Sequence, residues 1–379
     1  MISGEAFVDE LLGQGYRFFS GVPCSYLTPF INTVIDSEVV EYIGAANEGD
    51  AVAAACGAEL GGKPSVVLFQ NSGLGNAVNP LTSLTDTFRI PVLILTTWRG
   101  EPERVQDEPQ HDVMGKITPD LLQLMGIPWE RFPDSMSELT RLLQRAKEHM
   151  RSTGTPFAIV VSKGTISGDA TPRALERQAP NTARMIPGTL AKPLDSDEVL
   201  QTVRSSAAPG DALLATTGFT GRALYALGDH DSQFYMVGSM GCVSSLGLGL
   251  ALAQPQRRIL VLDGDGALLM RMGAVATIGH AAPDNLVHIL LDNGAHDSTG
   301  SQSTVAPGID LAAVAQACGY AHVARVDSLS ELEKHLKRGR RQLTFLHLCT
   351  APRSRRKLPR PTITPPQVAE RFRKWLAQA

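Results

Sequence analysis

The chain has 379 residues, of which 43% are hydrophobic and 19% are charged. This length and composition allow two ordinary globular domains with buried cores. The formal net charge of −3 argues against nucleic-acid binding through bulk electrostatics, and no apolar run approaches the roughly 20 residues of a membrane span.

The start of the chain argues against a targeting segment. Its first fifteen residues, MISGEAFVDELLGQG, are amphipathic and acidic, whereas a signal peptide begins with a basic segment and an apolar one. The five cysteines, Cys24, Cys56, Cys242, Cys318 and Cys349, have no C-x-x-C spacing, which favours reduced thiols. We therefore expect a cytoplasmic protein without a membrane or nucleic-acid partner.

Helix and strand patterns alternate through the first 165 residues. Helix patterns cover 4–15, 47–62, 73–84 and 139–150, and strand patterns cover 16–22, 39–45, 65–70, 91–97 and 156–162. Such alternation is typical of α/β proteins with a doubly wound parallel sheet. We predict one such domain over 1–165.

Residues 166–194 contain four prolines and no sustained period, which predicts a linker. The alternation then restarts, with helix patterns at 196–207, 218–228, 242–254, 272–281, 311–320 and 329–339, and strand patterns at 211–217, 233–238, 257–266, 285–294, 321–326 and 342–350. We predict a second doubly wound domain over 195–379. Its basic, proline-rich tail is expected to form a solvated surface strap before a short terminal helix.

Two neighbouring strand patterns of the second half end in polar residues. Asp265 lies between Gly264 and Gly266, and Asn293 ends the next strand pattern. Ligands of doubly wound sheets bind at the carboxyl ends of strands, glycines let a backbone approach an anion closely, and Mg²⁺ prefers oxygen ligands such as a carboxylate, an amide and the carbonyl of Ala295. The alternative is that both segments are only turns, since DG and NG are common turn dipeptides.

The spacing resembles the diphosphate-binding motif of thiamine diphosphate enzymes: Gly-Asp-Gly at 264–266, 26 residues, then Asn293. The resemblance implies that Asp265, Asn293 and the carbonyl of Ala295 hold Mg²⁺, and that Gly266 and Ala267 offer N–H groups to the diphosphate. It also implies two domains that bind the pyrimidine (1–165) and the diphosphate (195–379), without the middle domain that many members carry.

The same resemblance assigns the activating acid to Glu48. This residue follows a strand pattern and opens an alanine-rich helix pattern, which is how the family presents the glutamate that faces the pyrimidine. The alternative is a surface glutamate favoured by the helix dipole. In the family, the two halves that bind one cofactor usually come from different subunits, which implies a homodimer or a larger homo-oligomer.

Further cofactor contacts carry over from the family pattern. Met240 matches the bulky apolar residue that supports the bent cofactor, and the carbonyl of Gly238 matches the acceptor for its 4′-amino group. Thr217 and Gly218 are expected near the diphosphate, and Pro23 near the pyrimidine. The alternative for Met240 is core packing.

Within this family, several blocks resemble phosphonopyruvate decarboxylases and their close relatives, the sulfopyruvate decarboxylases. These blocks are GVPCSYLTPF, QNSGLGNAVNPLTSL, PVLILTTWRG, DEPQHDVMG, VGSMGCVSSLGLGLA and LDNGAHDSTGSQ. The resemblance implies a carboxy-lyase that converts 3-phosphonopyruvate to phosphonoacetaldehyde and CO₂. Sulfopyruvate or another 2-oxoacid is the alternative substrate.

The substrate contacts expected on this basis all lie in the first half: Ser25, Gln70, Asn71 and Arg99. A phosphonate needs cationic or hydroxyl donors, which Arg99 and Ser25 could supply, with Arg222 a weaker candidate; each arginine could instead serve in an ion pair. His111 is expected to transfer a proton or to orient the carboxylate, its alternative being a surface histidine.

Two other classes of function fit the sequence less well. The stretches 247–253 and 72–77 superficially resemble dinucleotide-binding loops. The first lies within a helix pattern, where its glycines are expected to permit close packing, and the second lacks a ribose-binding acid about twenty residues on. A regulatory thiamine diphosphate-binding protein without turnover is the non-enzymatic alternative. One departure from the family pattern is Ser301, which stands where the family usually has glycine.

Overall fold

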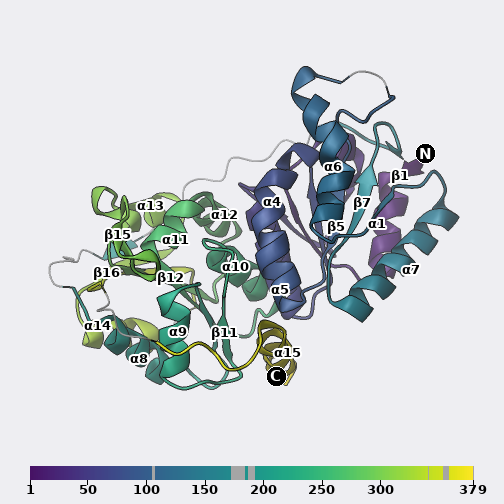
Figure 1. Cartoon of the computed structure of the whole chain (residues 1–379). Helices are drawn as coiled ribbons and strands as arrows, with labels where there is room; N and C mark the ends of the chain where they lie inside the picture. Colours follow the sequence, from purple (N-terminus) through teal and green to yellow (C-terminus); the bar gives the residue numbers. More distant parts are fainter. Residues whose placement is uncertain (105–106, 172–183, 187–192, 340, 353–357, 379) are drawn as a thin grey trace. The chain divides into compact units, whose positions relative to one another are not determined.

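A computed structural model describes all residues except 105–106, 172–183, 187–192, 340, 353–357 and 379. The chain divides into two compact units, Met1–Arg177 and Gln178–Ala379 (Figure 1). Each unit contains one large parallel sheet with helices, so the predicted fold class is confirmed. The described residues form no third, middle domain.

Most of the predicted linker, 166–194, lies outside the described residues. Its described parts form two short strands. β8 (Ile166–Ser167) pairs with β1 (Ile2–Ser3) in the first unit, and β9 (Arg184–Ile186) joins the main sheet of the second unit.

The main sheet of the first unit has six parallel strands in the order β3-β2-β4-β5-β7-β6. They are β2 (Phe18–Gly21), β3 (Glu41–Gly44), β4 (Ser65–Phe69), β5 (Leu93–Thr97), β6 (Trp129–Arg131) and β7 (Phe157–Val161). The central strands β2, β4, β5 and β7 are buried along their whole length. This explains why they read as continuous apolar runs instead of alternating patterns.

Helices cover this sheet: α1 (Gly4–Gly13), α2 (Thr28–Asp36), α3 (Glu48–Leu60), α4 (Leu74–Pro80), α5 (Asp86–Phe88), α6 (Asp112–Leu124) and α7 (Met136–Thr153). An aromatic cluster on one face joins Phe7 to Phe30 and Phe132, with ring centres 4.8 and 4.9 Å apart. On α3, small side chains allow close contact with β2, β4 and α4, and nearly all of this helix is buried. Helix α6 was not predicted, because Pro119 interrupts its pattern.

The main sheet of the second unit has seven parallel strands in the order β11-β10-β12-β13-β17-β16-β9. The strands not yet named are β10 (Ala212–Ala215), β11 (Gln233–Tyr235), β12 (Ile259–Gly264), β13 (Leu286–Asp292), β16 (His322–Val326) and β17 (Thr344–Cys349). Leaving β9 aside, the first to sixth strands of both units follow the same order, 2-1-3-4-6-5. The chain reverses direction across the sheet between β10 and β12, and such a switch point is where these sheets bind ligands.

The helices of the second unit are α8 (Ser196–Ser206), α9 (Phe219–Ala226), α10 (Val243–Ala253), α11 (Asp265–Met270), α12 (Gly273–Ala281), α13 (Leu311–Ala317), α14 (Leu329–Leu336) and α15 (Pro365–Leu376). Gly247 on α10 lies so close to β12 that a Cβ there would sit 2.4 Å from a methyl group of Val261. Glycine at position 247 therefore allows α10 to pack closely against β12. The terminal helix α15 was predicted and lies against β11. In the described part of the chain, no helix is long and apolar enough to span a bilayer.

Candidate active site

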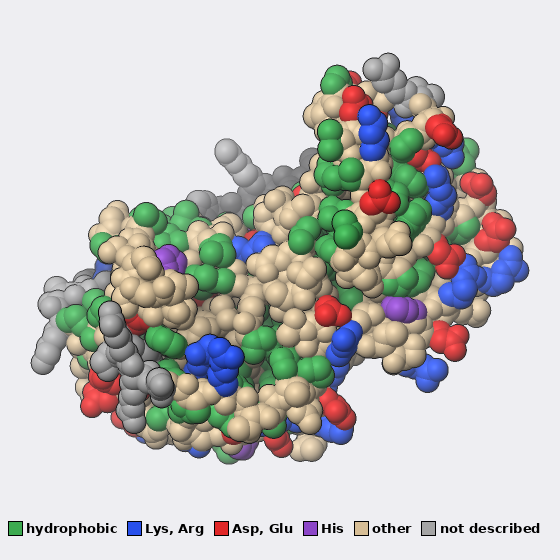
Figure 2. All heavy atoms as spheres, in the orientation of Figure 1, with side chains coloured by type: hydrophobic (Ala, Val, Ile, Leu, Met, Phe, Trp, Pro, Cys, Tyr) green, Lys and Arg blue, Asp and Glu red, His purple; other side chains and the backbone are tan. Residues whose placement is uncertain are grey.

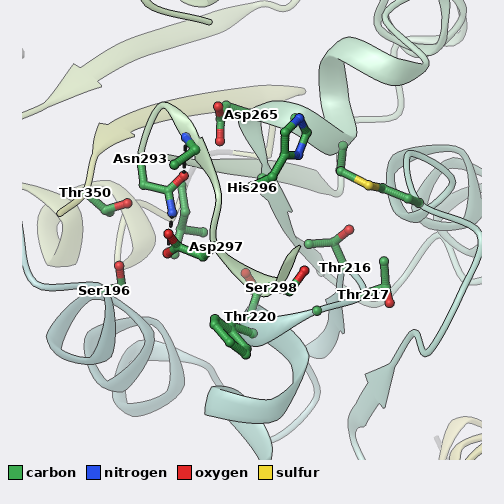
Figure 3. A pocket seen from close by; sticks show the side chains of 18 residues that line it. Ser196, Thr216, Thr217, Thr220, Asp265, Asn293, His296, Asp297, Ser298 and Thr350 are labelled. Atoms are coloured by element: carbon green, nitrogen blue, oxygen red, sulfur yellow. Dashed lines mark hydrogen bonds between the residues drawn. The ribbon is translucent and has the colours of Figure 1, made fainter. Parts of the chain in front are cut away.

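A cavity at the switch point of the second unit gathers residues from five strand ends (Figure 3). The loops after β10, β11, β12, β13 and β17 all contribute to its wall. Eight of the nine residues predicted for this unit line it: Thr217, Gly218, Met240, Asp265, Gly266, Ala267, Asn293 and Ala295. Gly238 is not in its lining. The structure thus brings these side chains together, and their roles remain predictions.

Asp265 is the first residue of α11 and is 2% exposed. Its Oδ2 accepts a hydrogen bond of 2.5 Å from the hydroxyl of Thr304. Burial raises the pKa of the Asp265 carboxyl, and the negative charge of Asp292 raises it further, while the Thr304 hydrogen bond opposes the shift. A buried carboxylate of this kind is costly unless a cation or donors compensate its charge, so the position favours a bound cation.

Asn293 and Ala295 form a tight turn directly after β13. The amide oxygen of Asn293 accepts from the backbone N–H of Ala295 at 3.0 Å, and its Nδ2 donates to Asp297 at 2.7 Å. Figure 3 shows this Asn293–Asp297 contact beside Asp265. The turn therefore fixes an amide oxygen and a backbone carbonyl at the same cavity as the Asp265 carboxylate.

Two glycines of the cavity wall stand where a larger residue would be crowded or strained. A Cβ at Gly266 would lie 2.6 Å from the imidazole of His296 and 3.4 Å from the end of Met240. Gly218 precedes α9 with a φ of 94°, a conformation that favours glycine, and a Cβ there would be 3.4 Å from the Ser298 hydroxyl. A side chain at Gly266 would clash with His296, and one at Gly218 would have a strained backbone, so glycine suits both positions where anion contacts were predicted.

The loop that carries Met240 has an unusual backbone. Ser239 and Gly241, on either side of Met240, have φ values of 50° and 88°. A left-handed non-glycine residue that is 3% exposed, as Ser239 is, marks a conformation that the surrounding structure must hold in place. This loop therefore sets the direction of Met240 toward the cavity.

Buried histidines support the acids behind the cavity. His288 contacts Asp263 at 3.2 Å and the hydroxyl of Tyr320 at 3.1 Å, and both Asp263 and His288 are fully buried. His347 contacts Asp292 at 2.9 Å. Asp263 is therefore held inside the fold by His288 and is not among the described residues that line the cavity.

In the first unit, Glu48 begins α3 directly after the N-cap residue Asn47, whose side chain accepts from Gly49. Its Oε2 accepts a hydrogen bond of 2.8 Å from Asn76. A Cβ at Gly73 would lie 2.1 Å from Oε1 of Glu48, so glycine is needed for the carboxylate to lie there. Glu48 is half-buried within the unit.

Gln70 and Asn71 follow β4 but differ in what their side chains do. Asn71 is fully buried, donates to the carbonyl of Arg99 and to Thr118, each at 3.0 Å, and accepts from the N–H of Arg99. Both amide hydrogens of Asn71 are therefore used inside the unit. Gln70 is half-buried and contacts Cys24 and Ser72.

Arg99 forms a bidentate ion pair with Asp107, with both N–O distances 2.6 Å. The ring of Tyr26 lies 4.8 Å below the guanidinium, and its hydroxyl donates to Asp107 at 3.0 Å. The Arg99 guanidinium holds the pKa of Asp107 well below its usual range. Burial, together with the bond to Asp107, raises the pKa of Tyr26 to about 12. The positive charge of Arg99 is thus already compensated within the unit.

The remaining predicted residues of the first unit lie on loops. Pro23 and Ser25, after β2, are exposed. His111 ends a short 3₁₀ turn before α6 and is 5% exposed. Its Nδ1 is buried without a hydrogen-bond partner among the described residues, which is an unusual state for a buried polar atom.

Several cavity residues were missed by sequence reasoning: Ser196, Thr216, Thr220, His296, Asp297, Ser298, Thr304 and Thr350. The short hairpin of β14 (Ala295–His296) and β15 (Gln302–Ser303) brings Thr304 back to the cavity. The polar residues that follow Asn293 were the sequence feature that could have indicated these cavity residues. The two strands of the hairpin have only two residues each, which is too short to show an alternating pattern.

The chain matches two family models. They are the N-terminal TPP binding domain of thiamine pyrophosphate enzymes, over residues 1–118, and the C-terminal TPP binding domain, over residues 223–348.

Relatives match nearly the whole chain. Two are phosphonopyruvate decarboxylases: one from Streptomyces viridochromogenes, 43% identical over 99% of this chain and 95% of its own length, and one from Streptomyces hygroscopicus, 41% identical over 100% and 95%. A sulfopyruvate decarboxylase from Methanosarcina acetivorans is 31% identical over 99% of this chain and 98% of its own length.

Solved structures share the fold. The benzoylformate decarboxylase of Polynucleobacter necessarius superposes with a TM-score of 0.71 over 95% of this chain and all of its own, at 13% identity. By its family models and its full-length relatives, the chain belongs to the thiamine pyrophosphate enzymes and, within them, to the phosphonopyruvate decarboxylase family.

Proposed function

We propose that this protein decarboxylates 3-phosphonopyruvate to phosphonoacetaldehyde and CO₂, with thiamine diphosphate and Mg²⁺ as cofactors. The observation that carries the proposal is the similarity to two phosphonopyruvate decarboxylases, at 41% and 43% identity over nearly the full chain. The sulfopyruvate decarboxylase is a more distant relative at 31%, so sulfopyruvate is the second candidate substrate.

The cavity of the second unit fits a diphosphate held through a magnesium ion. Asp265 offers a carboxylate, Asn293 an amide oxygen and Ala295 a backbone carbonyl, and Mg²⁺ combines such ligands with phosphate oxygens. The described residues contain no group of three or more His, Cys, Asp and Glu side chains that could hold a metal. The ion therefore depends on these mixed oxygens and on the phosphate itself.

The backbone supplies the remaining anion contacts. The N–H groups of Gly266 and Ala267 lie in the first turn of α11, where they have no intrahelical acceptor. Gly218 lines the same cavity and has a φ of 94°, a conformation that favours glycine. Met240 supports the cofactor body, and the carbonyl of Gly238 accepts from its amino group.

When bound, thiamine diphosphate supplies an electron sink for the bonding electrons released as the substrate carboxylate leaves as CO₂. Glu48 holds a proton at the pyrimidine N1′ position, with Asn76 fixing the carboxylate through Oε2. Pro23 lies against the pyrimidine.

His111 provides the proton that replaces the lost carboxylate on the product. Its buried Nδ1, which has no partner among the described residues, supports a role that involves a further group. Ser25 and Gln70 contact the substrate. Arg99 and Asn71 stay predicted substrate ligands; their bonds within the unit also suit them to shaping the loop that leads to His111.

The active enzyme is a homodimer or a larger homo-oligomer, in which Glu48 of one subunit serves the cofactor whose diphosphate is held by Asp265 of another. This proposal is supported by the way the predicted residues are divided between the two units. The activating acid belongs to the unit Met1–Arg177, and the diphosphate residues belong to the unit Gln178–Ala379.

The test is CO₂ release from phosphonopyruvate, sulfopyruvate and pyruvate, each offered with thiamine diphosphate and Mg²⁺. We expect the highest kcat/KM with phosphonopyruvate and no turnover when the cofactor is omitted. A preference for sulfopyruvate would assign the second candidate function, and a preference for pyruvate would contradict the proposal.

A further inference from the structure

A second cavity of the Gln178–Ala379 unit adjoins the cofactor cavity. It lies between α9, the segment after β11 and the C-terminal strap, which we define as residues 358–364. Thr217 and Gly218 line both cavities. The two cavities therefore lie next to each other, with Thr217 and Gly218 between them.

The charge of the second cavity is entirely positive. Among the described residues, its charged lining residues are Arg222 of α9 and Arg360 of the strap, and none is acidic. Arg222 is half-buried and its guanidinium lies 5.9 Å from the ring centre of Phe219. Neither arginine forms an ion pair within the described residues. Figure 2 shows basic side chains gathered on the face where, in Figure 1, the yellow strap crosses beside α9.

The strap is held in place close to Arg360. The hydroxyl of Tyr225, on α9, lies 3.0 Å from that of Thr362 and accepts from its backbone N–H at 3.2 Å. Farther on, Arg371 of α15 pairs with Asp229 through two contacts of 2.6 and 2.5 Å. The strap was expected to be a solvated surface segment; four of its seven residues are exposed, and it also forms one wall of a cavity.

Arg99, the other arginine considered as a phosphonate ligand, already has an ion-pair partner. Arg99 already donates two hydrogen bonds to Asp107, so binding a dianion there must compete with a carboxylate. Arg222 and Arg360 face no such competitor in the cavity lining. An arginine guanidinium binds phosphate-like groups through paired, charge-assisted hydrogen bonds.

We propose that the cavity between α9 and the C-terminal strap is the subsite for the phosphonate group of the substrate, with Arg222 and Arg360 as its ligands. This inference rests on the proposed function. The same chemistry would also suit the diphosphate of the cofactor, because the two cavities share a wall, and the test must separate these two anions.

The experiment uses the full-length protein loaded with thiamine diphosphate and Mg²⁺. R222Q and R360Q are compared with the wild type on phosphonopyruvate, sulfopyruvate and pyruvate, and the cofactor Kd is measured for each variant. The matched control is R151Q, which replaces an exposed arginine of α7 in the other unit.

We expect R222Q to lower kcat/KM for phosphonopyruvate about 10- to 100-fold, mainly through KM, as loss of a charge-assisted contact would. R360Q should act in the same direction but less, because Arg360 is exposed. The loss should be smaller for the singly charged sulfonate and absent for pyruvate, and the cofactor Kd and R151Q should stay at wild-type values.

Equal losses on all three substrates, or a rise in the cofactor Kd, would overturn the subsite and assign the cavity to the cofactor. Unchanged kinetics in both variants would also overturn it. If the wild type itself does not decarboxylate phosphonopyruvate, the proposed function fails instead, so the two failures are distinguishable.

Discussion

The hydroxyl of Thr304 lies 2.5 Å from Oδ2 of Asp265, although 39 positions separate the two residues in the chain. The hydrogen bond fixes the orientation of a carboxylate that is 2% exposed. Groups that orient metal ligands typically change metal affinity 10- to 100-fold when they are removed.

We therefore expect T304V to weaken Mg²⁺-dependent cofactor binding about 10-fold, and D265N to abolish it. Titration of thiamine diphosphate at fixed Mg²⁺, followed calorimetrically, measures both. D284N, at an exposed ion pair with Arg341, is the control and should bind normally. Wild-type affinity in D265N would remove Asp265 from the metal site.

We proposed that Glu48 holds a proton at the pyrimidine of the cofactor. Its carboxyl should therefore matter more for turnover than for cofactor binding. We expect E48Q to lower kcat by at least about 100-fold, a typical contribution of a positioned acid or base, with little change in the cofactor Kd. Steady-state kinetics and cofactor titration measure the two quantities. E38Q, an exposed glutamate of the same unit, should behave as wild type.

Mixing E48Q with D265N subunits extends this prediction to the assembly. If each site takes Glu48 from one subunit and Asp265 from another, random reassociation of dimers restores about a quarter of the wild-type activity, because half of the dimers carry one intact site of two. No recovery after proven reassociation would contradict the shared site.

The Arg99–Asp107 pair predicts a pH dependence of stability. The folded pKa of Asp107 is depressed, so the pair stabilises the protein above the ordinary aspartate pKa of about 3.9, and the contribution is lost as pH falls toward the folded value. We expect D107N to unfold at a lower temperature than wild type at pH 5–8, with the difference shrinking below about pH 4. Thermal unfolding across this pH range measures the difference in unfolding temperature.

A temperature difference that grows on acidification would contradict this account. The control is D120N, which replaces an aspartate on the exposed side of α6.

Ser301 has a φ of 62° in the segment between β14 and β15. A non-glycine residue pays about 1–2 kcal/mol for this conformation, whereas glycine adopts it freely but loses about 0.5–1 kcal/mol of unfolded-state entropy. We expect S301G to be neutral or to raise the free energy of unfolding by up to about 1 kcal/mol. S303G, in β15, should lower it by about 0.5–1 kcal/mol, and denaturant unfolding compares the two. A clear loss of stability in S301G alone would show that the Ser301 hydroxyl, 3.3 Å from Asp297, matters more than its backbone.

Much of the fold and of the cavity at the switch point of the second unit could be predicted because both depend on local pattern. Buried parallel strands produce apolar runs, and residues that follow neighbouring strands meet at one edge of the sheet. Asp265 and Asn293 could be found in this way, since β12 and β13 are adjacent in both chain and sheet.

The contacts that were missed depend on where loops return. Thr304 reaches Asp265 only because a hairpin of two-residue strands turns back toward the cavity. The pairing of Arg99 with Asp107 arises within a loop that has no periodicity. Arg360 lines the same cavity as Arg222 only because of the path of the C-terminal strap. Such approaches are set by tertiary packing, which no local pattern records.

The most direct measurement of the central claim is ³¹P NMR of phosphonopyruvate incubated with the protein, thiamine diphosphate and Mg²⁺. We predict that the substrate signal is replaced by that of phosphonoacetaldehyde, with one CO₂ released per molecule and no conversion by E48Q. An unchanged phosphorus spectrum with the wild-type protein, under conditions where the cofactor is bound, would contradict the account.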